Sequence, residues 1–139
     1  MTRHACLVLL VSGVLLGTNI GVAGASTNPG PVNTTYNFSA NLYGSTHFTV
    51  YGGSGVRFEM KGTYGPSEIV DITVEVQTCG FLGCHWNGAT VGGTCTRTLF
   101  VGGDAVCNFS GAPNSNELHR IDMSKRTDGF TIKGNATIS

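Results

Sequence analysis

Residues 70–77 read VDITVEVQ, and this stretch decides the fold class. Apolar and polar residues alternate strictly along it, so in a β-strand the two kinds of side chain occupy opposite faces. In a helix the same apolar side chains would be spread around the whole circumference. The pattern therefore predicts a strand with one face on a core and one face in water. The apolar positions are Val70, Ile72, Val74 and Val76, and the polar positions are Asp71, Thr73, Glu75 and Gln77.

Similar alternating segments, separated by turn residues, occupy the chain on either side of this stretch. The predicted strands cover residues 34–43, 46–51, 56–61, 70–77, 94–101, 105–110, 119–123 and 130–138, with Gly134 as a candidate β-bulge. About seven or eight antiparallel strands without a helical segment indicate an all-β protein. A β-sandwich is favoured over a small barrel, because half-apolar strands suit two sheets packed face to face.

The first 25 residues have the three parts of a secretory signal peptide. Arg3 and His4 form a basic start, residues 5–16 an apolar run, and residues 23–25 the small side chains that signal peptidase accepts. The apolar run is too short for a membrane of ~30 Å, which a helix of ~20 residues spans. We expect cleavage after Ala25, secretion of the mature chain and no retained membrane span.

Removing the first 25 of 139 residues leaves 114, enough for one domain. Residues 26–33 contain two prolines and are expected to form a flexible N-terminal arm, followed by a single domain over residues 34–139. Without Arg3, seven of the eight basic residues remain, against eight acidic ones. Nucleic-acid binding and attachment to anionic membranes both need a basic excess, so neither is expected. We expect a monomer.

The cysteine count indicates disulfides rather than a metal site. Of five cysteines, Cys6 falls in the signal peptide, which leaves an even number in an exported domain. The alternative is a zinc site, but the sequence has no Cys-x-x-Cys pair. Three pairings are open for the remaining Cys79, Cys84, Cys95 and Cys107, and the simplest joins Cys79 to Cys84 and Cys95 to Cys107.

Residues 79–93 read CGFLGCHWNGATVGG and form the most unusual segment. A connection of about fifteen residues exceeds the usual loop length, and long loops are often functional. A ring closed by Cys79 and Cys84 would hold Phe81 and Leu82, with the only tryptophan, Trp86, just beyond it. The alternative is that these side chains plug the open end of the sandwich. The predicted binding residues are Phe81, Leu82, His85 and Trp86.

The sequence offers little for catalysis or metal binding. His47, His85 and His119 lie on different segments, so no metal site or other cofactor is expected. Ser54 lies in a Gly-Gly-Ser-Gly turn rather than in a strand-to-helix nucleophile elbow. Cys84 and His85 would form a thiol dyad only if Cys84 were free.

The carboxylates also give no catalytic pattern. Glu59, Asp71 and Glu75 fall on predicted solvent faces, whereas a glycosidase needs two carboxylates facing each other in a cleft. No catalytic residue is therefore predicted, and carboxylates converging from neighbouring strands would favour a small hydrolase. Four N-x-S/T sequons begin at Asn33, Asn37, Asn108 and Asn135, and they matter only in a host that glycosylates exported proteins.

The leading hypothesis is a secreted, non-catalytic binding module that contacts an extracellular protein, glycan or surface through residues 79–93. The alternative is a secreted inhibitor or toxin-like effector that acts on another protein. Both need only a rigid apolar patch, so the sequence does not separate them, and fold class alone does not carry function. An exposed Phe81 and Trp86 would favour these two hypotheses over a hydrolase.

Overall fold

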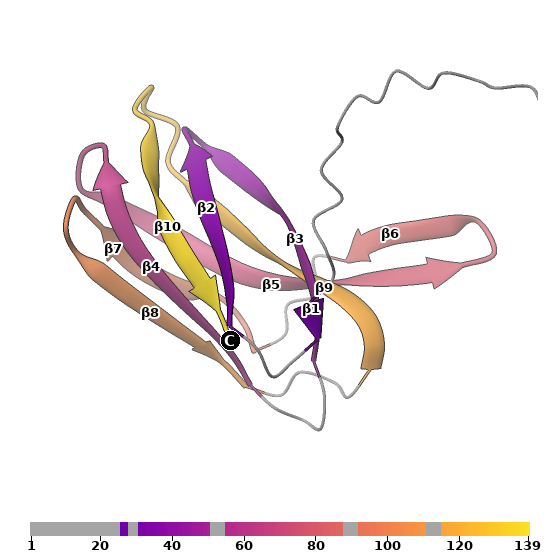
Figure 1. Ribbon diagram of the computed structural model, residues 1–139. Helices are drawn as coiled ribbons and strands as arrows, with labels where there is room; N and C mark the ends of the chain where they lie inside the picture. Colours follow the sequence, from indigo (N-terminus) through magenta and orange to yellow (C-terminus); the bar gives the residue numbers. More distant parts are fainter. Residues whose placement is uncertain (1–25, 28–30, 51–54, 88–91, 111–114) are drawn as a thin grey trace, which may run out of the picture.

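The computed structural model describes residues 26–27, 31–50, 55–87, 92–110 and 115–139. The expected signal peptide, Ser54 and residues 88–91 lie outside the described residues. The described chain forms ten strands in two packed sheets (Figure 1). It contains no helix long and apolar enough to cross a membrane.

Six strands form one sheet and four form the other. The six-stranded sheet has the order β1-β3-β9-β5-β6, and β7 also pairs with β5. The strands of this sheet are β1 (Ser26–Thr27), β3 (Asn41–Val50), β5 (Glu68–Gly80), β6 (Gly83–Asn87), β7 (Cys95–Leu99) and β9 (Ser115–Lys125). The four-stranded sheet has the order β2-β10-β4-β8. The strands of this sheet are β2 (Val32–Phe38), β4 (Val56–Tyr64), β8 (Asp104–Phe109) and β10 (Ile132–Ile138).

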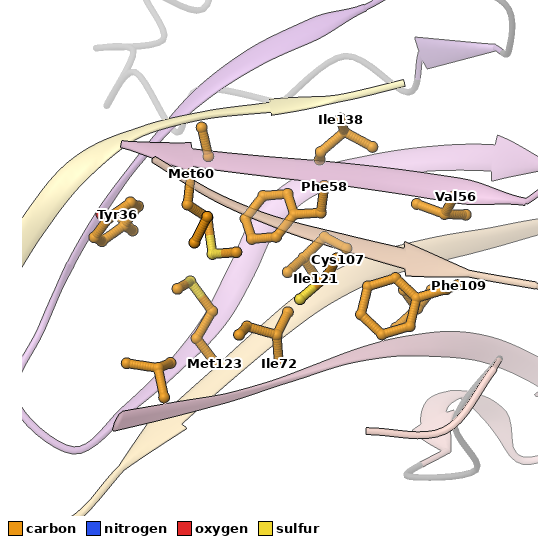
Figure 2. Close-up of a cluster of buried hydrophobic side chains, with 14 of the residues drawn as sticks. Tyr36, Val56, Phe58, Met60, Ile72, Cys107, Phe109, Ile121, Met123 and Ile138 are labelled. Carbon is orange, nitrogen blue, oxygen red and sulfur yellow. The ribbon is translucent and has the colours of Figure 1, made fainter. Parts of the chain in front are cut away.

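The all-β sandwich is confirmed, with more strands than expected. Pairing is antiparallel among these strands except between β1 and β3. On β5 the predicted apolar face points into the core, where Val70, Ile72 and Val74 are fully buried. Side chains of both sheets interdigitate between the layers (Figure 2). The core includes Tyr36, Phe58, Met60, Phe109, Ile121, Met123 and Ile138.

The first half of the chain differs from the prediction in its strand boundaries. The strand expected over residues 34–43 is divided, because the chain leaves the four-stranded sheet after Phe38 and enters the other at Asn41. β3 then continues through the predicted break, with a register irregularity between Tyr43 and His47. Within residues 26–33, where a flexible N-terminal arm was expected, Ser26 and Thr27 form β1, which pairs with β3, and β2 begins at Val32.

Both disulfides have the simplest of the three pairings. Cys95–Cys107 joins β7 to β8 and so links the two sheets along one side of the sandwich. Cys79–Cys84 joins the directly opposed residues of β5 and β6. The β-bulge expected at Gly134 is not found on β10: Lys133 lies opposite Tyr64 and Gly134 opposite Gly62, so the extra residue is Thr63 of β4, and Gly134 stays in regular register with β2.

Candidate functional site

Residues 79–93 do not form one long loop, because much of the segment is a β-hairpin. β5 pairs with β9 only as far as Val76, and beyond it residues 77–80 pair with β6 alone. This two-stranded extension projects from the body of the sandwich (Figure 1). Phe81 and Leu82 form the turn, and Gly83, with φ of 114°, adopts the left-handed backbone that lets β6 return.

The hairpin tip, defined as Phe81 and Leu82, is fully exposed. The relative exposures of these side chains are 103% and 98%, the highest of the exposed large hydrophobic residues. The Cys79–Cys84 disulfide closes the hairpin directly behind them, with a Cα–Cα distance of 4.0 Å. Residues 76–87 contain no Lys, Arg, Asp or Glu. The chain therefore presents two apolar side chains on a stapled, uncharged support.

The other two predicted binding residues lie behind the tip. His85 is exposed on β6, opposite Thr78. Trp86 is half-buried at the base of the hairpin, where its ring centroid lies 4.9 Å from that of His47. The structure therefore brings Phe81 and Leu82 together at the tip and separates Trp86 from them.

Trp86 belongs to a group on the outer face of the six-stranded sheet that sequence reasoning missed. The Arg120 guanidinium carbon lies 4.5 Å from the centroid of Trp86 and 5.0 Å from that of Tyr43. Arg120 also forms ion pairs with Glu75 at 2.7 Å and with Asp122 at 3.1 Å. We call the group the Arg120 cluster; its members are Tyr43, His47, Glu75, Trp86, Arg120 and Asp122.

Strand register explains how the cluster forms. Arg120 on β9 lies opposite Glu75 on one side and His47 on the other, and Tyr43 lies opposite Asp122. Side chains opposed across antiparallel strands on one face are close enough to pair. The cluster therefore ties four strands together, and the contact of Arg120 with Trp86 fixes the base of the hairpin.

The expectation that Glu75 lies in solvent was wrong. Its side chain is only 15% exposed, because it packs against Arg120 within the cluster. The other two carboxylates do lie on solvent faces, where Asp71 accepts a hydrogen bond from Thr96 and Glu59 pairs with Arg57.

Glu75 on β5 and Asp122 on β9 converge from neighbouring strands, which is the kind of arrangement that would favour a small hydrolase. Asp122 is buried, accepts the Gly44 N–H at 3.2 Å and lies 3.1 Å from Arg120 Nε, which also donates to Glu75. Burial, together with a side-chain hydrogen bond to Glu75, raises the pKa of Asp122 to about 6. Two carboxylates engaged with one guanidinium and with each other are held for ion pairing, whereas a glycosidase pair leaves about 5–9.5 Å for the sugar and water.

We expect the Asp122→Asn substitution to weaken the dependence of the free energy of unfolding on pH at acidic pH. The folded carboxyl, with a pKa of about 6, binds a proton that the unfolded carboxyl, at 3.8, does not. Stability therefore falls as pH rises between these values, by up to roughly 3 kcal/mol. Asparagine removes this loss and can donate to Glu75, so the variant should equal or exceed the parent at neutral pH.

Urea denaturation of both proteins between about pH 4 and pH 7 measures this effect. His119 acts in the opposite direction, because burial lowers its pKa and stability is lost as pH falls below the ordinary value of 6.5. Both proteins contain His119, so the difference between their profiles isolates Asp122. Parallel profiles would show that the Asp122 carboxyl is not perturbed.

The three histidines do not converge on a metal site. His119 is fully buried, stacks on Phe48 with 5.9 Å between ring centroids, and has Nδ1 3.0 Å from the Glu117 carbonyl oxygen. His47 lies in the Arg120 cluster, and His85 lies near the hairpin tip. Among the described residues, no three His, Cys, Asp or Glu side chains are placed to hold a metal ion.

Comparison of the chain with protein-family models, with curated proteins and with solved structures finds no match.

Proposed function

We propose that this chain is a secreted, non-catalytic binding module whose hairpin tip contacts an extracellular partner. The observation that carries the proposal is the full exposure of Phe81 and Leu82 on a disulfide-closed hairpin outside the core. Folding does not require these side chains, and burying each of them against a partner would contribute about 1.5–3 kcal/mol. A preorganised hairpin also loses little conformational entropy on binding.

Convex shape favours a protein partner over a glycan. The tip presents aliphatic and aromatic surface without a charged group, which suits an apolar pocket on another protein. The same geometry supports the alternative of an inhibitor or toxin-like effector, because a rigid protruding hairpin can enter the cleft of a target. These two functions share one contact surface and differ in what the target does when it is occupied.

Export is the second part of the proposal. Two disulfides are compatible with an oxidising extracellular environment. The four sequon asparagines are all exposed on strands of the four-stranded sheet. In a glycosylating host, glycans on that sheet would leave the hairpin uncovered.

We expect the mature protein in the culture supernatant to begin at Ser26. Intact-mass and N-terminal peptide measurements on the secreted protein check this, and the intact mass also reports whether all four cysteines are oxidised. Recovery of only the uncleaved chain from the membrane fraction would contradict export.

We expect Phe81→Ser combined with Leu82→Ser to abolish partner binding while leaving the melting temperature within about 2 °C of the parent. Both side chains are fully exposed, so their removal opens no cavity. The measurement is photocrosslinking from position 81 in the medium of the producing cells. The control carries the same photoreactive residue at Asn37, on the four-stranded sheet.

The proposal is supported if position 81 forms a crosslink that an excess of unlabelled parent protein suppresses. The same excess of the unlabelled double variant should leave that crosslink in place. Equal crosslinking from positions 81 and 37, or equal competition by the double variant, would contradict it.

A further inference from the structure

A second apolar surface lies at the other end of the sandwich from the hairpin. Four large side chains from three turns are more than half exposed: Tyr64 (61%), Phe100 (51%), Val101 (58%) and Phe130 (58%). They lie at the end of β4, in the β7–β8 connection and before β10. These segments gather on one side of the molecule, and β6 projects from the other (Figure 1). We call these four residues the apolar end.

The apolar end is one surface rather than scattered residues. Tyr64 and Phe100 line the same shallow depression. Val101 forms a β-bridge to β4 close to Tyr64. The turn that carries Phe130 packs against the turn that follows Tyr64, where the backbones are in close approach. Three connections therefore bring exposed apolar residues to the same end of the sandwich.

Backbone groups in these turns are already hydrogen-bonded within the protein. The Gly103 N–H donates to the Phe100 carbonyl at 3.0 Å, and the Phe130 N–H donates to Asp128 Oδ1 at 3.0 Å. Moving a backbone N–H or C=O group out of water costs little free energy when the group has a hydrogen-bond partner within the protein. The same transfer costs several kcal/mol when the group has none. These hydrogen-bonded groups therefore add little to the free-energy cost of moving the turns out of water.

The charged residues around the apolar end have a small basic excess, with four cations against three carboxylates. Lys133 and Arg126 are exposed, and neither forms an ion pair with a described residue; the Lys133 ammonium lies 5.2 Å from the centroid of Tyr64. Aromatic rings flanked by basic side chains are typical of surfaces at the membrane–water interface. Of the three carboxylates at this end, Asp128 and Glu68 share the buried Lys125, and Asp104 lies opposite Lys61 in the register of β8 and β4.

We infer that the apolar end is a docking surface for a lipid bilayer. Turns that protrude, with only a shallow depression between them, suit a fluid surface that needs no matching shape. The balanced total charge of the chain gives no reason to expect strong electrostatic attachment, so insertion of the apolar side chains dominates the binding and the small basic excess at this end adds to it. Attachment is reversible, with a partition constant no larger than that of one myristoyl chain, on the order of 10⁴ M⁻¹. This site is independent of the hairpin tip.

The test is co-sedimentation of the mature protein with vesicles of phosphatidylcholine, alone or mixed with phosphatidylserine. We expect binding to both, tighter by about tenfold or less with phosphatidylserine. Phe100→Ser combined with Phe130→Ser should weaken binding at least about tenfold. Val101→Asp gives a second disrupting variant at a side chain that is 58% exposed. The Phe81→Ser, Leu82→Ser protein should bind vesicles like the parent.

Absence of binding to either kind of vesicle would overturn the inference and leave the apolar end for a protein partner. Loss of binding in the hairpin variant, with the apolar-end variants unchanged, would also overturn it and place lipid contact at the tip. Because the two sets of variants lie at opposite ends of β5, failure here is distinguishable from failure of the hairpin proposal.

Discussion

Val74→Asp unfolds the domain under conditions in which the parent is stable. Val74 is fully buried on β5, opposite the buried Ile121 of β9, with the four-stranded sheet packed over both. An ionised carboxylate there has no cation or donor within the apolar core, and burying it costs more than about 5 kcal/mol. That loss equals or exceeds the stability of many domains of this size. Circular dichroism at neutral pH should show loss of the cooperative thermal transition.

Ile69→Asp is the matched control on the same strand. Ile69 is 66% exposed, so the same kind of substitution places its charge in water and should shift stability by less than about 1 kcal/mol. A cooperative transition in Val74→Asp close to that of the parent would show that β5 does not present this face to the core. Equal damage from both substitutions would mean that the sheet is covered on both faces.

The strand that carries Val74 was predictable because its signal is local. Strict alternation over residues 70–77 fixes both the strand and its buried face without knowledge of any neighbour. The even number of cysteines, together with the expected signal peptide, predicted the disulfides in the same way. The alternation did not predict the crossover at residues 39–40, where the chain passes from one sheet to the other. No Gly or Pro stands at these positions, so the alternating pattern continues from β2 into β3 without a visible break.

The Arg120 cluster was not predictable for a different reason. Alternation places Glu75 and Arg120 on polar faces, but it does not say which strands are neighbours. Their ion pair joins residues 45 positions apart and depends on the β5–β9 register. Glu75 was therefore assigned to solvent, and Asp122 was not considered. The sequence signal that could have found this face is the presence of aromatic residues, Tyr43 and Trp86, among the polar ones, because aromatic side chains seldom lie fully in water.

The hairpin was only partly predictable. The sequence located the stapled ring and the two side chains at its tip, because Cys79 and Cys84 bracket them. It did not reveal that residues 83–87 pair with the end of β5, since residues 79–93 were interpreted as one long connection. Pairing rotates Trp86 onto the sheet face, and so the tryptophan belongs to the base of the hairpin.

Removal of the Cys95–Cys107 disulfide should cost about 3 kcal/mol. The bridge closes a loop with a sequence separation of 12, and the chain-entropy estimate for a loop of this length is about 3 kcal/mol. It also joins the two sheets, and Cys107 is fully buried in the core. The Cys95→Ala, Cys107→Ala protein should melt about 10–15 °C below the parent, as measured by thermal circular dichroism.

Removal of the Cys79–Cys84 disulfide is the control, and its expected effect on global stability is small. This bridge lies in the projecting hairpin. The hairpin residues beyond Val76, where the β5–β9 pairing ends, contribute nothing to the core cluster. Without the bridge, the hairpin gains freedom in the folded state as well as in the unfolded state, so most of the entropic effect cancels. The Cys79→Ala, Cys84→Ala protein should therefore melt within a few degrees of the parent while its tip becomes more susceptible to proteolysis. Equal falls in melting temperature for the two double variants would show that the hairpin unfolds together with the core, and the tip could then no longer be treated as an element free to serve binding alone.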